Sequence, residues 1–227
     1  MRSTADFNAF YQNAPDPWGV AGAERRDWTL SRIIKPHIEG KSVLELGCGE
    51  GHLTATVFRP AKFVTGVDIS TIAVERATTL HLPNASFEAR DFLDVTFAGY
   101  DVIAAIECLY YLTPDEQEAF LRKLRAEHAG TFIVSGPIIG KNEHRTYFTH
   151  SGLLSTFARH GLSVIEWSNL NAYRRAGLGG LFVAVATRLS DDVLPWVPER
   201  YVYQRCYVLR TRTTENLRSG CPFKPAQ

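Results

Sequence analysis

Three glycines and two acidic residues lie close together in the segment Ser42-Val-Leu-Glu-Leu-Gly-Cys-Gly-Glu-Gly-His-Leu53. The glycines Gly47, Gly49 and Gly51 follow an apolar run and precede a run compatible with a helix. This pattern is typical of the strand, turn and helix that open a βαβ unit. Glycine has no Cβ, so the backbone can turn sharply there and a ligand can approach it closely. We therefore expect a ligand to bind at this turn.

The acidic residues Glu45 and Glu50 indicate the charge of that ligand. A dinucleotide-binding turn usually reads G-x-G-x-x-G and presents the N-terminus of a helix to a pyrophosphate. Here the spacing is G-x-G-x-G, with an acid on each side of the first two glycines. Carboxylates repel an anion and attract a ligand with positive groups. S-adenosylmethionine (SAM), which carries an ammonium and a sulfonium, is such a ligand.

A third acid supports the same cofactor. Asp68 lies 17 residues after Gly51 and ends the apolar run 63–67, where a carboxylate can accept hydrogen bonds from two ribose hydroxyls. The Gly-rich segment, its acids and Val67-Asp68-Ile69 together resemble the class I SAM-dependent methyltransferases. The alternative is an α/β domain with an ordinary Gly-containing turn.

Composition limits the class of protein. The 227 residues are enough for one large α/β domain with its own core. A net charge of +1 gives no electrostatic footprint for nucleic acid, so we expect a small-molecule acceptor instead. Four cysteines without metal-ligand spacing predict reduced thiols, no metal and a cytoplasmic protein. We find no secretory signal and no membrane span, and the oligomeric state stays open between monomer and homodimer.

Hydrophobic periodicity predicts an alternating series of strands and helices. Seven strands are expected, at residues 41–46, 63–67, 85–89, 101–106, 131–135, 163–167 and 181–187. Helices are expected at about residues 7–11, 24–34, 52–58, 70–80, 113–128 and 149–160. The second of these should end before Pro36, because proline cannot continue a helix. The last two strands should pair as a hairpin at the sheet edge.

These elements predict an α/β fold, and the resemblance makes it Rossmann-like, with a seven-stranded, mostly parallel sheet and helices on both faces. We expect residues 1–40 to form an N-terminal helical cover and residues 41–189 the SAM-binding domain. Residues 190–227 should be a C-terminal extension packed on the same globule. Aromatic and basic residues interleave in this extension, which favours a half-buried strand or helix over a membrane or nucleic-acid surface.

Further site candidates follow the predicted strands. Glu107, Tyr110 and Tyr111 come directly after the strand 101–106, which is apolar on both faces as a central parallel strand should be. Ligands of open α/β sheets bind at the carboxyl ends of the strands. Core packing is the alternative explanation for the two tyrosines. Asp91 and Phe92 follow the third strand, where an acid can reach an adenine amino group, although Asp91 could equally cap a turn.

The resemblance extends to a narrower group. Asp16-Pro17-Trp18, Glu24-Arg25-Arg26, the Gly-rich segment and Glu107-Cys108-Leu109-Tyr110-Tyr111-Leu112 resemble the nodulation methyltransferase family. Members of this family methylate the free amine of a deacetylated chitooligosaccharide. The resemblance covers residues 1–189, and the remaining residues have no counterpart in it.

Together these patterns give a set of cofactor-binding residues. The aromatic residues of the N-terminal cover would close over the cofactor, and an arginine from Glu24-Arg25-Arg26 would bind its carboxylate with two parallel hydrogen bonds. The alternative is that the aromatic residues only pack the cover on the sheet domain. The resulting cofactor set is Tyr11, Trp18, Arg25, Glu45, Gly47, Cys48, Gly49, Asp68, Ile69, Asp91, Phe92 and Ile106.

Methyl transfer from a sulfonium is an in-line displacement that releases S-adenosyl-L-homocysteine. An amine acceptor is protonated near neutral pH and must lose a proton before it attacks, so a positioned base is needed. Glu107 is the first candidate base, with Tyr110 and His144 as further catalytic candidates. The candidate acceptor-binding residues are Tyr111, Arg145, Tyr147 and His150. The resemblance thus implies an N-methyltransferase that acts on the amine of an amino sugar or of a sugar-containing metabolite. The alternatives are an O-methyltransferase that acts on a sugar or natural-product hydroxyl, and a non-catalytic SAM-binding scaffold.

Overall fold

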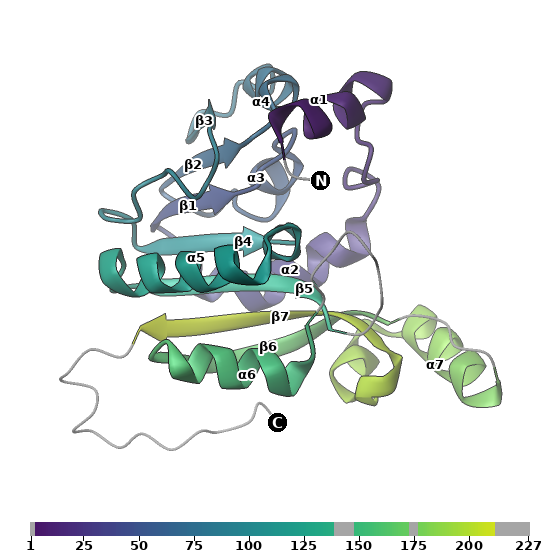
Figure 1. Cartoon of the computed structure of the whole chain (residues 1–227). Coiled ribbons are helices and arrows are strands. Elements are labelled where there is room, and N and C mark those ends of the chain that lie inside the picture. Colours follow the sequence, from purple (N-terminus) through teal and green to yellow (C-terminus); the bar gives the residue numbers. More distant parts are fainter. Residues whose placement is uncertain (1–2, 139–147, 173–176, 212–227) are drawn as a thin grey trace.

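The computed structural model describes residues 3–138, 148–172 and 177–211, and it contains a seven-stranded sheet of order β3-β2-β1-β4-β5-β7-β6 (Figure 1). Strands β1 to β5 run parallel, whereas β7 pairs antiparallel with both β5 and β6. The strands are β1 (Ser42–Leu46), β2 (Phe63–Asp68), β3 (Ala85–Ala89), β4 (Val102–Ile106), β5 (Thr131–Pro137), β6 (Leu162–Ala172) and β7 (Val202–Thr211). The predicted α/β fold with a mostly parallel sheet is confirmed.

The helices are α1 (Thr4–Asn13), α2 (Glu24–Ile38), α3 (His52–Thr56), α4 (Thr71–Thr78), α5 (Pro114–Glu127), α6 (His150–Arg159) and α7 (Leu178–Leu189). Three short 3-10 helices are η1 (Leu109–Tyr111), η2 (Asp191–Trp196) and η3 (Glu199–Tyr201). The predicted end of the second helix was wrong, since α2 continues through Pro36 to the buried Ile38. Pro36 lies in the last turn, where Ile38 extends the apolar face begun by Leu30 and Ile34.

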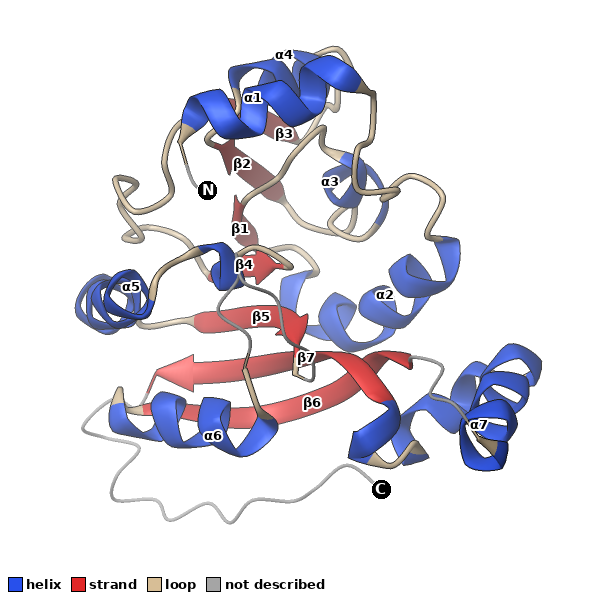
Figure 2. Cartoon of the chain, turned by 45° about the vertical axis from the view of Figure 1, so that its right-hand side comes forward, coloured by secondary structure: helices blue, strands red, loops and turns tan. Residues whose placement is uncertain are grey.

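The core lies on both faces of the sheet. Along β4, Val102, Ala104 and Ile106 pack with α2, while Ile103 and Ala105 face the layer that contains α5 and α6. Every residue of β4 is buried, as expected for a central parallel strand. Figure 2 shows α5 and α2 on opposite sides of the sheet. Among the described helices, none has the length and apolar character that crossing a bilayer requires.

The C-terminal part of the chain differs from its prediction. Residues 181–187 are not a strand but lie within α7, because Val183 and Thr187 are buried at helical spacing while the residues between them are not. The last strand is instead β7, from the segment expected to be an extension. The expected antiparallel pairing at the sheet edge does form, but between β6 and β7, which are separated in sequence by α7.

The topology brings distant residues to one edge. The carboxyl ends of β1 to β5 lie together because these strands are parallel. Since β7 is antiparallel, its first residues lie at the same edge, with Gln204 opposite Pro137 of β5. Helix α1 packs on α4, where Asn8 hydrogen-bonds the Ser70 hydroxyl at 2.7 Å (Figure 1). This contact holds the N-terminal cover beside the Gly-rich turn.

Candidate active site

A cavity of about 280 Å³ opens at this edge of the sheet. It is lined by the segments that follow β1, β2, β3 and β4, by the N-terminal cover and by the start of β7. The predicted residues that line it are Tyr11, Trp18, Gly47, Cys48, Gly49, Asp68, Ile69, Asp91, Phe92, Ile106, Glu107, Tyr110 and Tyr111. The structure therefore brings most of the candidate cofactor and acceptor residues into one cavity.

The Gly-rich turn requires glycine for two reasons. Gly47, Gly49 and Gly51 have positive φ values of 70°, 53° and 79°, which side-chain-bearing residues rarely adopt. A Cβ on Gly49 would also lie 2.9 Å from the Tyr11 hydroxyl, and one on Gly47 would lie 2.8 Å from the Cβ of Cys108. The glycines thus permit the turn itself and the close approach of the segments around it.

Asp68 is fixed at the turn by backbone donors. Its Oδ2 accepts a hydrogen bond from the Gly49 N–H at 2.9 Å, and its Oδ1 accepts one from the Ser70 N–H at 2.9 Å. Burial raises the pKa of the Asp68 carboxyl, and these N–H groups oppose that rise. Each oxygen keeps a second lone pair, so Asp68 can still accept hydrogen bonds from a ligand in the cavity.

Glu45 lies elsewhere and does not line the cavity. It belongs to β1, is buried, and accepts a hydrogen bond from the Thr54 hydroxyl of α3 at 2.5 Å. Burial raises the pKa of Glu45 to about 8, so its carboxyl is largely protonated near neutral pH. The predicted attraction between Glu45 and a positive cofactor therefore has no support in this geometry, because the strand directs the side chain into the core.

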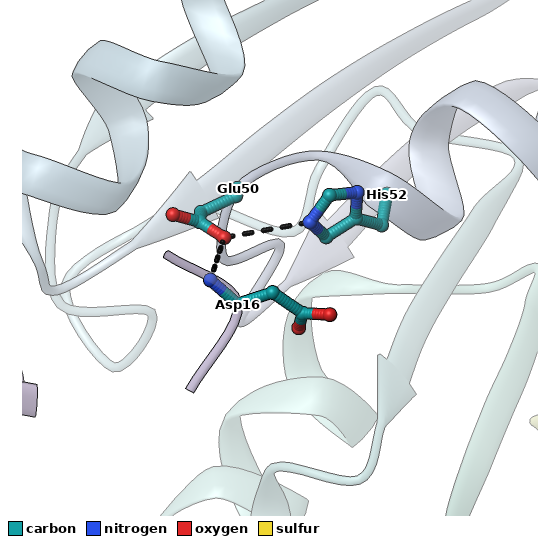
Figure 3. Close-up of side chains that lie close together, drawn as sticks. All are labelled: Asp16, Glu50 and His52. Carbon is teal, nitrogen blue, oxygen red and sulfur yellow. Dashed lines mark hydrogen bonds and ion pairs between the residues drawn. The ribbon is translucent and has the colours of Figure 1, made fainter. Parts of the chain in front are cut away.

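Glu50, the other acid of the turn, connects it to the N-terminal cover (Figure 3). One Glu50 oxygen accepts a hydrogen bond from the Asp16 N–H at 2.7 Å and lies 3.4 Å from His52 Nε2, while the other pairs with Arg76 at 2.6 Å. The Asp16 carboxylate accepts the N–H groups of Val20 and Ala21 at 2.7 and 2.8 Å. The loop after α1 is therefore held against the turn by polar contacts.

Within the described residues, Asp16, Glu50 and His52 form the group whose possible metal-ligand atoms lie within 4.8 Å of one another. Both carboxylates already have protein partners, as Arg76 pairs with Glu50 and backbone N–H groups bind Asp16. His52 Nε2 is buried and lies next to the Glu50 carboxylate. We therefore interpret the group as a polar wall of the cavity.

The arginine that lines the cavity is Arg26, not the Arg25 chosen from the sequence. Arg26 Nη2 lies 2.8 Å from an oxygen of Asp27 and 3.3 Å from the carbonyl oxygen of Val20. Arg25 is exposed. Successive residues of an α-helix point about 100° apart, so only one of the two can face the cavity.

Glu107 is held by two donors at the carboxyl end of β4. The Ser135 hydroxyl donates to its Oε1 at 2.7 Å, and the Gln204 amide donates to its Oε2 at 2.7 Å. The backbone of Glu107 has a positive φ of 56°, which is uncommon outside functional sites for a residue with a long side chain. The carboxylate is therefore fixed in orientation at the wall of the cavity.

An aromatic wall covers the same end of the cavity. The Tyr111 ring lies 4.7 Å from that of Tyr110, 5.4 Å from that of Phe7 and 6.1 Å from that of Trp18, measured between ring centroids. Phe7 belongs to α1 and Trp18 to the loop after it. Both tyrosines line the cavity, and Tyr110 is also buried. Packing in the core and lining of the cavity are therefore compatible explanations for Tyr110.

The charged residues in the lining of the cavity are mostly acidic. They are Asp16, Arg26, Glu50, Asp68, Asp91 and Glu107. The single arginine among them is already paired with Asp27. An excess of carboxylates at close range attracts positive groups, so the cavity suits a ligand, or a pair of ligands, that carries positive charge.

The remaining predicted residues lie outside this cavity or outside the described part of the chain. His150 begins α6, and its Nδ1 lies 2.8 Å from the hydroxyl of Tyr207, with the two rings stacked. His150 is half-buried, which lowers the pKa of its imidazole, and it does not line the cavity. His144, Arg145 and Tyr147 fall within 139–147, which the structure does not describe.

Sequence reasoning missed several residues of the cavity. The most informative are Tyr203 and Gln204, which β7 contributes beside Glu107. The signal was present in the alternating aromatic and polar residues at the start of 202–211, but it could only be used once that strand was placed in the sheet. The other lining residues outside the predicted cofactor and acceptor sets are Phe7, Asp16, Val20, Arg26, Glu50, His52, Leu53, Cys108 and Leu112. Of these, Glu50 was already noted in the sequence as an acid of the turn, and Arg26 as one of the two candidate arginines.

Comparisons with known proteins agree with this geometry. Residues 43–127 match the family model described as a methyltransferase domain. The nodulation protein S of Azorhizobium caulinodans is 28% identical over 135 residues, which are 55% of this chain and 64% of that relative. The matched part of the chain spans between about half and two thirds of the length of the curated relatives.

Two solved structures have the same fold. Magnesium protoporphyrin IX methyltransferase from Synechocystis PCC 6803, with bound SAM, has a TM-score of 0.65 at 14% identity and covers 93% of this chain and 98% of its own. The Burkholderia thailandensis 1,6-didemethyltoxoflavin-N1-methyltransferase, with bound 1,6-didemethyltoxoflavin and S-adenosylhomocysteine, also has a TM-score of 0.65, at 19% identity, covering 92% and 87%.

Proposed function

We propose that this chain, whose residues 43–127 form a methyltransferase domain with the class I fold, transfers a methyl group from SAM to the amine of a small polar acceptor. The acceptor class that we favour is an amino sugar or a metabolite that contains one. The observation that carries this proposal is Glu107, a carboxylate held by two donors in an acidic cavity with aromatic walls.

The cofactor half of the cavity contains the groups that SAM requires. Asp68 has free lone pairs for the ribose hydroxyls, and Asp91 with Phe92 can bind the adenine amino group and ring. Arg26 supplies donors for the methionine carboxylate, in place of the Arg25 expected from the sequence. When bound, SAM supplies an electrophilic methyl group on a positively charged sulfur, and the acidic lining stabilises that charge.

The acceptor half of the cavity supports an amine as the acceptor. A protonated amine is attracted to Glu107, and the same carboxylate can then take its proton, which leaves the lone pair free to attack. The faces of Tyr110 and Tyr111 add cation–π attraction for a positive group. Ser135 and Gln204 do not need to touch the acceptor, since their hydrogen bonds fix the carboxylate that does.

The test combines cofactor binding with an acceptor screen. SAM and S-adenosyl-L-homocysteine are titrated calorimetrically into the purified chain, and turnover is then measured with amino sugars, their N-acetylated forms and their hydroxyl counterparts. We expect both nucleosides to bind and only the free amines to be methylated. Turnover on the hydroxyl counterparts would instead support an O-methyltransferase, and binding without turnover on any member would remove the amino-sugar acceptor while leaving the cofactor assignment.

A further inference from the structure

Helix α7 has apolar residues on two opposite faces. Its inner face is packed, as Gly180, Val183 and Thr187 are buried, and a Cβ on Gly179 would lie 2.5 Å from the Tyr201 hydroxyl of η3. Its outer face carries large side chains that remain in solvent. Figures 1 and 2 both place α7 at the periphery, beyond the ends of β6 and β7.

The exposed fractions on the outer face are high for apolar residues. Leu178 is 87% exposed, Phe182 73%, Val185 49% and Leu189 82%. We call these four residues the α7 seam. With Leu181 and Trp196 they present on the order of 800 Å² of apolar side chain, which is about the area that each partner buries in a standard-size interface. Patches of this size usually mark an interaction site.

The spacing of the α7 seam identifies the kind of partner. Its residues are separated by four, three and four positions, which is the spacing of the apolar positions that pair two helices by knobs-into-holes packing. The order is the same when it is read backwards. An antiparallel copy of the same helix therefore places Leu178 opposite Leu189 and Phe182 opposite Val185 across a two-fold axis.

The charge of α7 also distinguishes among partners. Arg188 is the only charged residue in the helix, so no like charges oppose pairing with a second copy. A helix that lies on a membrane surface usually has several lysines or arginines on the face opposite its apolar side. In α7 that opposite face is packed against η3 and the rest of the protein, so a lipid surface fits the helix less well.

We propose that two copies of this chain form a homodimer through antiparallel packing of their α7 seams. The proposal is independent of the reaction that the cavity catalyses, because none of the seam residues lines that cavity. The oligomeric state can therefore be tested without a substrate.

The first experiment measures the mass of the full-length chain by sedimentation velocity and light scattering over a wide range of concentration. We expect a reversible dimer. Phe182→Glu and Val185→Lys should each raise the dimer dissociation constant by at least about tenfold, since each buries a charge in the seam. Phe63→Glu is the matched control, because Phe63 is also exposed, at 42%, but lies on β2. This control should dimerise like the wild type.

Mixing the variants tests the antiparallel register. The antiparallel register contains two contacts between Phe182 and Val185. In a mixed dimer of the Phe182→Glu and Val185→Lys chains, one of these contacts pairs a carboxylate with an ammonium, and the other keeps the wild-type residues. The mixture should recover dimers, whereas a mixture of Phe182→Glu with Val185→Glu should not. The proposal would be overturned if the wild-type chain stayed monomeric, even if it then bound lipid vesicles or another protein. Unchanged dimers in both single variants would overturn it as well.

Discussion

The half of the cavity around the Gly-rich turn and the half around Glu107 are built from different parts of the chain. The first half uses Gly47 to Glu50, Asp68 and Asp91, which follow three strands that are consecutive in sequence. The second half joins Glu107 to Gln204, 97 residues later. A site made from successive βα turns can be inferred from motifs, whereas one completed by a distant antiparallel strand depends on topology.

From this difference we expect that substitutions can impair the two halves of the cavity independently. Changes in the first half should weaken cofactor binding, and changes in the second should slow methyl transfer while the cofactor still binds.

Glu107→Gln should lower turnover by about 10²–10⁴, the range attributed to a positioned base. The amide keeps the volume of the side chain but cannot take a proton from the acceptor. SAM affinity, measured by calorimetry on the same sample, should change little. A variant with wild-type turnover would exclude Glu107 as the base.

Asp68→Ala should weaken SAM binding by about 10²-fold or more, because two hydrogen bonds to a charged group are lost and each contributes about 1.5–3 kcal/mol. Calorimetric titration measures this directly. Asp94→Ala is the matched control, since Asp94 is exposed and does not line the cavity. Equal SAM affinity in the two variants would contradict the assignment of Asp68.

Gln204→Ala should reduce kcat by about tenfold, as it removes one of the two donors that orient Glu107 and leaves the carboxylate itself in place. SAM affinity should stay at the wild-type value. Arg210→Ala, at the exposed far end of β7, serves as the control. If Gln204→Ala instead lowered SAM affinity and turnover together, the separation into two halves would not hold.

Glu45→Gln should change the pH dependence of stability and leave turnover near the wild-type value. In the folded chain the pKa of Glu45 is raised to about 8 from 4.5, so the unfolded state releases its proton first as the pH rises. The free energy of unfolding that Glu45 contributes is therefore fully present below about pH 4.5 and is lost by the time the pH passes 8.

Urea denaturation at pH 5 and at pH 8.5 measures this effect. The variant should gain stability relative to the wild type at the higher pH, by on the order of 4 kcal/mol. The exposed Glu75→Gln serves as the control. If the free energies of unfolding of Glu45→Gln and the wild type differed by the same amount at both pH values, burial of Glu45 would have no effect on its ionisation.

The sequence predicted the parts of the fold that depend on local patterns. The glycine turn, the helix predicted at 113–128 and the acid at the end of β2 are each specified by neighbouring residues. The segment 181–187 was misassigned because its valines favour a strand locally, although Val183 and Thr187 pack as a helix. Gln204 was missed because its position beside Glu107 depends on the insertion of β7 between β5 and β6. Local sequence patterns do not specify that insertion.

We propose that methyl transfer from SAM to an amine takes place in this cavity. The most direct test incubates the chain with SAM carrying a ¹³C-labelled methyl group and a free amino sugar, and it locates the label in the product by NMR. We predict that the label appears as an N-methyl group and is absent when the amine is acetylated. A label found on oxygen, or no transfer to any amine when SAM is shown to bind, would contradict the account.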